Sequence, residues 1–237
     1  MSFDNRYQTQ INLPEIGVNG QNAIENSNVL VIGAGGLGCP VLMYLSALGI
    51  GKIGVVDFDV VNVKNLNRQI IYKETDIGKF KVDLVKEKMK EQNSQLEIVT
   101  YNVRFSDENA LTILEDFDFV IDCCDNYETR YVIDSNCFST GKPWIYAAVG
   151  GFEGQLSVFN YKKKVRYKDV YSDKSIFKTI DACDVQGVVG STCGFAASLQ
   201  VNEAIKIILN REDVCEGELL VFNLLDLKLR KFKLNHM

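Results

Sequence analysis

Apolar residues in the first half of the chain occur in short blocks that alternate between the pattern of a buried strand and that of a helix. Residues 29–33 form a continuous apolar run, and apolar residues then recur at helical spacing until glycines stop the helix near residue 49. Further strands are expected at 52–59, 96–101 and 117–126, and further helices at 78–93, 107–115 and 127–140. This alternation predicts a parallel sheet with right-handed crossover connections.

The hydrophobic pattern changes beyond Gly141. Two strand-like runs surround a glycine-rich turn at 150–154, and residues 217–234 are typical of an antiparallel hairpin. Residues 162–190 are polar with weak periodicity, which favours a mobile loop, and the helix that follows is expected at 195–210. The predicted fold class is therefore α/β: a Rossmann-like, mainly parallel sheet extended by antiparallel strands in the C-terminal half.

The chain is long enough for one domain. At 237 residues it can bury roughly 70% of its unfolded surface without help from disulfides or metals. We expect a single domain, 1–237, made of an N-terminal arm (1–28), a nucleotide-binding half (29–140) and a second half (141–237) that contains the expected loop.

Composition and charge exclude several function classes. No apolar run approaches the roughly 20 residues of a membrane span, and the polar residues 1–28 do not form a secretory signal, so we expect a cytoplasmic protein. A net charge of −5 argues against a nucleic-acid partner. The seven cysteines include no C-x-x-C pair, which predicts free thiols. The only histidine, His236, lies next to the last residue, so histidine-based nucleophile schemes are excluded.

The first strand runs into a glycine turn. Gly33, Gly35, Gly36 and Gly38 fit the pattern G-x-G-x-x-G between a strand and a helix, where backbone N–H groups can bind phosphate oxygens. Asp57 stands at the end of the next strand, where a carboxylate can accept hydrogen bonds from ribose hydroxyls. These features predict a nucleotide site. No P-loop lysine follows the glycines, so a P-loop kinase or GTPase is excluded.

A dinucleotide oxidoreductase is the first alternative for such a motif. Two observations weaken it: the chain lacks a histidine for acid–base work, and no tyrosine is followed four residues later by a lysine. The downstream residues Arg68 and Lys81 suit a triphosphate better, because cations there would neutralise phosphate charge. Asp125, after the fourth strand, could hold Mg²⁺. The alternative is that Arg68 and Lys81 are surface charges and that Asp125 caps the next helix.

Five segments, in order, carry a family resemblance: "RYQTQINLPEIGVNGQ", "VLVIGAGGLGCPVLMYLSALGIGKIGVVDFDVVNVKNLNRQI", "DIGKFK", "VIDCCDNYETR" and "GFEGQLSVF". They resemble the MoeB/ThiF family of adenylyltransferases, bacterial relatives of ubiquitin-activating enzymes, over nearly the whole chain. The resemblance implies ATP-dependent adenylation of the C-terminal glycine of a small β-grasp sulfur-carrier protein ending in Gly-Gly, of the ThiS or MoaD type. The products are an acyl adenylate and pyrophosphate, used for sulfur incorporation in thiamin or molybdopterin biosynthesis.

The resemblance also implies roles for individual residues. Its implied nucleotide and Mg²⁺ contacts are Gly33, Gly35, Gly36, Asp57, Asn65, Arg68, Gln69, Lys81 and, for Mg²⁺, Asp125. Arg68 and Lys81 would contact phosphates, whereas Asn65 and Gln69 would support their loop. The family further implies a homodimer, a carrier-binding second half and a sulfurtransferase or cysteine desulfurase as a partner.

The chain departs from the family pattern at three places. Thr9 stands where members commonly carry an arginine that reaches ATP across the dimer, and Arg6 is either its substitute or a surface residue. Arg166 and Asp169 occupy the positions of the first zinc-binding cysteine pair, so we expect no zinc site and either packing or an Arg166–Asp169 ion pair in its place. Cys183 matches a cysteine that joins the carrier in thiamin-type members.

The role of Cys183 stays open at this stage, because nearby acids oppose the thiolate form that a nucleophile needs. It is either a sulfur-transfer nucleophile or an unused loop cysteine. The departures also leave a second hypothesis for the whole chain: a nucleotide-binding, E1-like partner protein with weak catalysis. The oxidoreductase hypothesis depends on the glycine motif alone.

Overall fold

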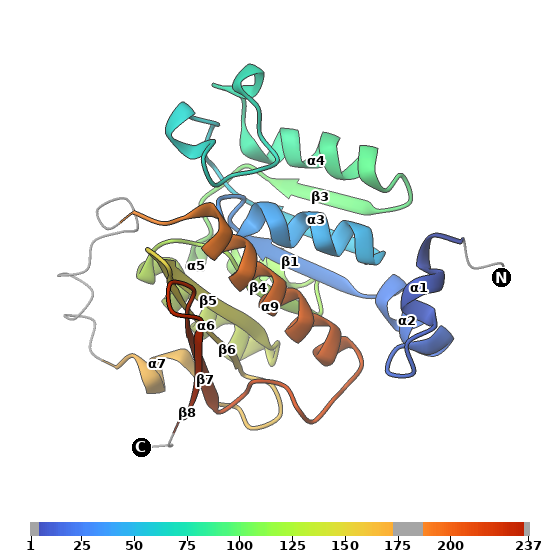
Figure 1. Ribbon diagram of the computed structural model, residues 1–237, viewed down its shortest axis with the longest axis vertical. Coiled ribbons are helices and arrows are strands. Elements are labelled where there is room, and N and C mark those ends of the chain that lie inside the picture. Colours follow the sequence, from blue (N-terminus) through green and yellow to red (C-terminus); the bar gives the residue numbers. More distant parts are fainter. Residues whose placement is uncertain (1–4, 173–186, 235–237) are drawn as a thin grey trace.

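The computed structural model describes residues 5–172 and 187–234, which form one eight-stranded sheet with helices on both faces (Figure 1). The strands are β1 (Asn28–Ile32), β2 (Lys52–Val56), β3 (Glu97–Tyr101), β4 (Phe119–Asp122), β5 (Trp144–Gly150), β6 (Glu153–Phe159), β7 (Glu218–Asn223) and β8 (Lys228–Lys233). The helices are α1 (Gln8–Ile11), α2 (Gly17–Glu25), α3 (Gly38–Leu48), α4 (Lys81–Gln92), α5 (Asp107–Leu114), α6 (Tyr127–Thr140), α7 (Tyr167–Val170) and α9 (Gly190–Ile208). Short 3₁₀ turns lie at Asn5–Tyr7, Val63–Asn65 and Glu74–Asp76.

The strand order is β3-β2-β1-β4-β5-β6-β7-β8. The first five strands are parallel, and β6, β7 and β8 add to the sheet in antiparallel register. The chain proceeds outward from β1 to β3 and then returns to the other side of β1 to form β4. This reversal between β1 and β4 is the position where open α/β sheets bind ligands, outside the carboxyl ends of the strands.

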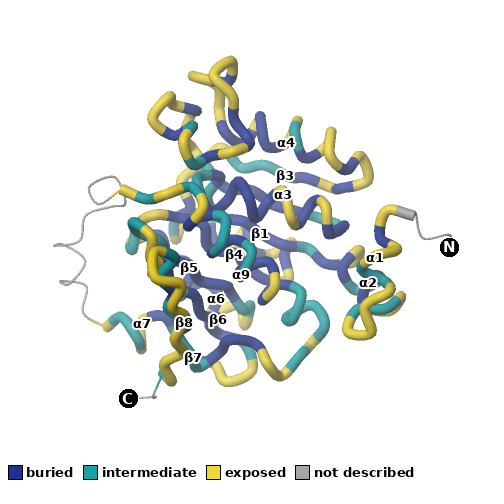
Figure 2. The backbone as a smooth tube through the Cα atoms, viewed as in Figure 1, coloured by how far each residue is buried: buried dark blue, intermediate teal, exposed yellow. Residues whose placement is uncertain are grey.

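The two faces of the sheet form two apolar layers. On one face α3, α4 and α9 cover the strands, and on the other α5 and α6 do so (Figure 1). The residues of β1 and β4 are almost all buried, as Figure 2 shows for the centre of the sheet. Burial on both faces explains why these parallel strands are continuous apolar runs rather than alternating ones. The predicted fold class is confirmed.

The N-terminal arm differs from a simple extension, because it contains α1 and α2. Both are short and polar, and α2 includes two glycines, which have low helix propensity. Their side chains instead complete the end of α3: Gln10 and Gln21 both donate hydrogen bonds to the carbonyl of Leu48, at 3.0 and 3.3 Å. These bonds satisfy a backbone carbonyl that the helix itself leaves unpaired.

Two further elements differ from the sequence prediction. Residues 167–170 form the short helix α7 inside the segment expected to be a loop, and its Tyr167 is buried among the aromatic residues of β5 and β6. Helix α9 begins at Gly190, five residues before the expected start. In the described residues no helix is long and apolar enough to cross a membrane.

Candidate nucleotide site

A cavity of about 860 Å³ opens at the carboxyl ends of the parallel strands, on both sides of the reversal between β1 and β4. Its volume is within the usual range for a small-molecule site. The structure brings these residues predicted to bind nucleotide or Mg²⁺ to its walls: Gly33, Gly35, Gly36, Asp57, Asn65, Arg68, Gln69, Lys81 and Asp125. Cys183, the remaining candidate, lies outside the described residues.

The glycine turn between β1 and α3 has no room for side chains at two positions. Gly33 has φ +101°, and a Cβ there would lie 2.6 Å from the carbonyl oxygen of Cys123. A Cβ on Gly38 would lie 2.0 Å from the carbonyl oxygen of Gly33. Within the described part of the chain, the N–H groups of Gly35 and Gly36 have no hydrogen-bond partner. Together with the start of α3 they form a surface suited to an anion.

Asp57 follows β2 and supports this turn from the side. One carboxylate oxygen accepts the N–H of Ala34 at 2.7 Å, and the other accepts the N–H of Asp59 at 2.8 Å. Burial raises the pKa of the Asp57 carboxyl, while nearby Lys81 lowers it. Each carboxylate oxygen can accept more than one hydrogen bond, so Asp57 keeps acceptor capacity for ribose hydroxyls.

Two cations line the cavity beyond Asp57. Lys81, the first residue of α4, is buried, and its Nζ lies 2.8 Å from a carboxylate oxygen of Asp59, an acid that we did not predict. Arg68 is half-buried and donates to the carbonyl of Lys64 and the side chain of Asn67, both at 3.1 Å. Lys81 is therefore not a free surface charge. Its ammonium is held in place by a carboxylate that itself lines the cavity.

Asn65 and Gln69 belong to the turn that carries Arg68. The carbonyl of Asn65 accepts the N–H groups of Arg68 and Gln69, at 3.1 and 2.9 Å, and both amide side chains are buried. The side-chain oxygen of Gln69 is buried without a hydrogen-bond partner in the described residues. Buried acceptors are normally paired, so this oxygen is available to a ligand or an ordered water.

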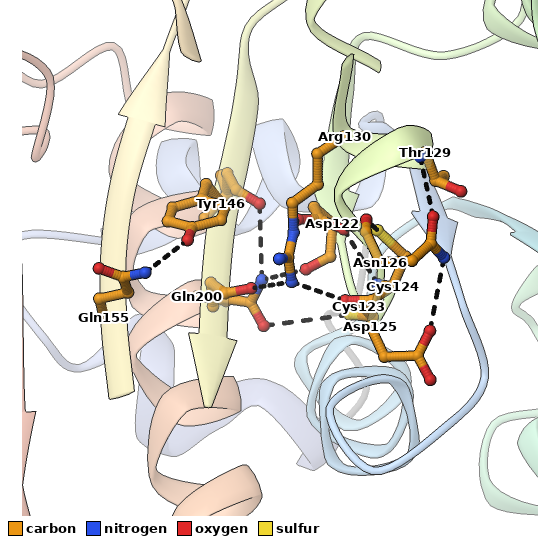
Figure 3. A network of polar contacts seen from close by, with 12 residues as sticks. Asp122, Cys123, Cys124, Asp125, Asn126, Thr129, Arg130, Tyr146, Gln155 and Gln200 are labelled. Carbon is orange, nitrogen blue, oxygen red and sulfur yellow. Dashed lines mark hydrogen bonds and ion pairs between the residues drawn. The ribbon is translucent and has the colours of Figure 1, made fainter. Parts of the chain in front are cut away.

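The turn after β4 carries a buried ion pair and an exposed acid (Figure 3). Arg130, on the first turns of α6, donates from Nε to Asp122 at 3.0 Å and from one Nη to the carbonyls of Cys124 and Ala147, at 2.8 and 3.2 Å. Asp122 in turn accepts the N–H of Cys124 at 2.9 Å. Burial raises the pKa of the Asp122 carboxyl, and Arg130 opposes that rise. The backbone of Cys124 is therefore held at both its N–H and its carbonyl.

Asp125 follows this clamped residue and is exposed in the cavity. The alternative, that Asp125 caps α6, is wrong, because the side chain of Asn126 accepts the N–H of Thr129 at 2.9 Å and so forms the cap. Asn126 also donates to the Asp125 carboxylate at 3.4 Å. One exposed carboxylate beside a phosphate-binding surface suits Mg²⁺, which usually takes one or two carboxylates together with substrate phosphates. No cluster of three metal-ligating side chains occurs in residues 5–172 and 187–234.

Sequence reasoning missed several polar residues of the cavity wall. They include Asp59 and Arg130, together with Tyr146 and Gln155, whose side chains are joined by a hydrogen bond of 2.7 Å (Figure 3). The Arg130 guanidinium lies 5.1 Å from the centre of the Tyr146 ring. The available signal was Asp122 itself. A carboxylate inside an apolar strand needs a buried cation nearby, and Arg130 follows on the next helix.

Two arginines that bear on the departures from the family pattern, Arg6 and Arg166, make contacts away from the cavity. Arg6 is exposed and donates to the carbonyl of Gln92 at 3.1 Å, and it does not line the cavity within the described chain. The expected Arg166–Asp169 ion pair is wrong: the Arg166 guanidinium pairs with buried Asp134 at 2.8 Å, and Asp169 accepts the backbone N–H of Arg166. The Arg166–Asp134 ion pair joins the start of α7 to α6. The prediction of no zinc site stays a prediction.

The chain resembles known proteins over nearly its whole length. The sequence profile of the ThiF family matches residues 7–237. A probable molybdopterin-synthase adenylyltransferase from Porphyra purpurea is 40% identical over 98% of this chain and 61% of its own length. An adenylyltransferase and sulfurtransferase MOCS3 from Culex quinquefasciatus is 42% identical over 92% of this chain and 50% of its own length. The chain thus spans about half to three-fifths of these relatives.

Solved structures show the same fold at low sequence identity. The crystal structure of E. coli MccB superposes with a TM-score of 0.86 and 22% identity, covering 100% of this chain and 71% of MccB. A crystal structure of E. coli MccB with ATP gives a TM-score of 0.82 at 22% identity, covering 99% of this chain and 73% of MccB. At this level of identity, the likeness concerns the fold alone.

Proposed function

This chain belongs to the ThiF family, and from that membership we propose that it adenylates the C-terminal glycine of a small sulfur-carrier protein. The nucleotide is ATP, and the carrier is a β-grasp protein ending in Gly-Gly. Relatives named molybdopterin-synthase adenylyltransferase favour a carrier of the MoaD type over one of the ThiS type.

One observation carries the proposal: a single cavity combines the groups that a nucleoside triphosphate needs. Unpaired N–H groups of the glycine turn suit phosphate oxygens, and Asp57 suits ribose hydroxyls. Arg68 and Lys81 supply positive charge, and the exposed Asp125 supplies a carboxylate. A dinucleotide oxidoreductase would not require two cations, Arg68 and Lys81, and the carboxylate of Asp125 beside its glycine turn.

The reaction that fits these groups needs no general base. The terminal carboxylate of the carrier is already ionised near neutral pH, and one of its oxygens attacks the α-phosphorus in line with the leaving pyrophosphate. A bond forms between the carboxylate oxygen and the α-phosphorus, and the bond between the α-phosphorus and the oxygen that it shares with the β-phosphorus breaks. No proton has to move. The chain can therefore do without a catalytic histidine, which agrees with His236 being its only one.

Catalysis then depends on position and charge. Arg68 and Lys81 stabilise the negative charge that builds on the phosphate oxygens, and the ion pair with Asp59 holds the Lys81 ammonium at the cavity wall. Asp125 would hold Mg²⁺, which neutralises phosphate charge when bound. We further propose that the chain works in the cytoplasm as a homodimer, with a sulfurtransferase or cysteine desulfurase supplying sulfur to the activated carrier.

ATP–pyrophosphate exchange tests this function. We expect the chain with MgATP to incorporate labelled pyrophosphate into ATP only when a carrier ending in Gly-Gly is present, because exchange requires the reversible formation of the acyl adenylate. A MoaD-type carrier is expected to support faster exchange than a ThiS-type carrier. A carrier shortened by its last glycine serves as the control and should give none.

Two other results would contradict adenylation. ATP binding without exchange for any carrier would favour the alternative of a nucleotide-binding, E1-like partner protein. Tight binding of NADH with no binding of MgATP would favour an oxidoreductase instead.

A further inference from the structure

Ala34 lies between the first two glycines of the glycine turn. Both its N–H and its carbonyl form hydrogen bonds with side chains. Its N–H donates to Asp57 at 2.7 Å, and its carbonyl accepts the hydroxyl of Tyr72 at 2.9 Å. The thiol of Cys39 makes a third, longer contact with the same carbonyl, at 3.6 Å. Because Ala34 directly precedes Gly35, these bonds set the direction of the N–H groups that face the cavity.

Tyr72 reaches Ala34 from behind the turn. Its side chain is buried with 6% of its surface exposed, and in the described chain neither Tyr72 nor Ala34 lines the cavity. Burial raises the pKa of the Tyr72 phenol, and the nearby Cys39 and Asp57 raise it further, so the hydroxyl remains a donor at physiological pH. Tyr72 therefore contacts the glycine turn from outside the cavity wall.

Tyr72 also belongs to the segment that carries the cation of the site. Its N–H donates to the carbonyl of Gln69 at 3.2 Å, directly after Arg68. The hydroxyl at the other end of the residue thus joins the Arg68 turn to the glycine turn, two segments that are far apart in sequence. Both contribute to the wall that would face phosphates.

We propose that Tyr72 is a positioning residue: its hydroxyl fixes the Ala34 carbonyl, so that the glycine turn is already shaped for phosphate and aligned with Arg68 before the nucleotide binds. This inference rests on the proposed use of ATP. It assigns a role to a residue that contacts neither substrate nor metal.

The test compares Tyr72→Phe with the wild type by calorimetric titration with ATP and with adenosine. We expect the dissociation constant for ATP to rise about 3–10-fold, the effect of one hydrogen bond, and that for adenosine to stay unchanged. Adenosine lacks phosphates, so a displaced glycine turn does not affect it. Tyr44→Phe, which removes the hydroxyl of an exposed tyrosine, is the matched control and should bind both ligands as the wild type does.

Three results would overturn the inference. Unchanged ATP affinity in Tyr72→Phe would show that the hydroxyl does not shape the phosphate site. An equal loss for ATP and adenosine would show that it supports the fold in general. A wild type that does not bind ATP would refute the proposed function first, and the inference with it.

Hydrogen exchange of the native chain gives a test that does not depend on the variant folding. We expect the Ala34 amide to exchange slowly without nucleotide, because a clamped turn already protects it. The Ala34 amide donates to Asp57, so exchange at the rate of an unprotected amide until ATP is added would show that the turn is shaped by the nucleotide and not by contacts within the free protein.

Discussion

Replacing Arg130 with methionine is expected to lower the free energy of unfolding by about 3–5 kcal/mol, the usual effect of breaking one side of a buried ion pair. The guanidinium is nearly enclosed, and its partner Asp122 is fully buried. Without Arg130, the Asp122 carboxylate loses the guanidinium that lies 3.0 Å from it, and the carbonyls of Cys124 and Ala147 lose a donor. Urea unfolding followed by circular dichroism measures the loss.

The exposed Arg211–Asp213 pair offers a matched control. It too joins an arginine and an aspartate by two hydrogen bonds, at 2.8 and 3.1 Å, but the two side chains are 40% and 57% exposed. Arg211→Met should leave the free energy of unfolding nearly unchanged, because water screens the pair. Equal losses for the two variants would contradict the account of Arg130 as a buried clamp.

The loss in Arg130→Met should also depend on pH in a set direction. Burial raises the pKa of Asp122 above its unfolded value of about 3.9, and removing Arg130 removes the charge that opposes this rise. A raised folded pKa favours the folded state below the unfolded pKa, and this contribution disappears as pH rises through the folded value. The variant should therefore lose less stability at pH 5 than at pH 8. A loss that is the same at both would contradict this assignment.

Asp125→Asn is expected to reduce carrier-dependent ATP–pyrophosphate exchange by about 100-fold or more, the usual effect of removing one electrostatic contact to a transition state. The substitution keeps the size of the side chain, and the cap of α6 at Asn126 is untouched. ATP affinity without Mg²⁺ should be unchanged. The increase in ATP affinity that Mg²⁺ produces in the wild type should be absent, because the variant lacks the carboxylate.

A distant acid serves as the control for Asp125. Glu115 is exposed at the end of α5, and Glu115→Gln should retain the wild-type exchange rate and the effect of Mg²⁺. If Asp125→Asn keeps both properties as well, Mg²⁺ is held elsewhere, and the proposed role of Asp125 is wrong.

Local sequence signals predicted the centre of the fold. The apolar runs of β1 and β4, the glycine turn at Gly33 and the helix α5 each depend on residues a few positions apart, so periodicity and turn chemistry detect them. The helices α1 and α2 were not predicted, because their composition does not favour a helix. Packing against the end of α3, where Gln10 and Gln21 bind Leu48, outweighs that propensity.

The sequence predicted which residues line the cavity better than it predicted the contacts between their side chains. Sequence placed Arg68, Lys81 and Asp125 near one strand edge, because parallel strands end on the same side of a sheet. It did not reveal that Lys81 pairs with Asp59, 22 residues away, or that Tyr72 bonds Ala34, 38 residues away. Such contacts depend on which side chains the tertiary fold buries together, and no local pattern encodes that.

The most direct test of adenylation follows an oxygen atom. A carrier whose terminal carboxylate is labelled with oxygen-18 is incubated with the chain and MgATP, and hydroxylamine then releases AMP from the product. If the carboxylate attacks the α-phosphorus, one of its labelled oxygens comes to link the acyl carbon to phosphorus. Hydroxylamine attacks the acyl carbon, so this oxygen leaves with phosphorus, and mass spectrometry will find oxygen-18 in AMP. Unlabelled AMP, or no AMP formed above the level without carrier, would contradict the central claim.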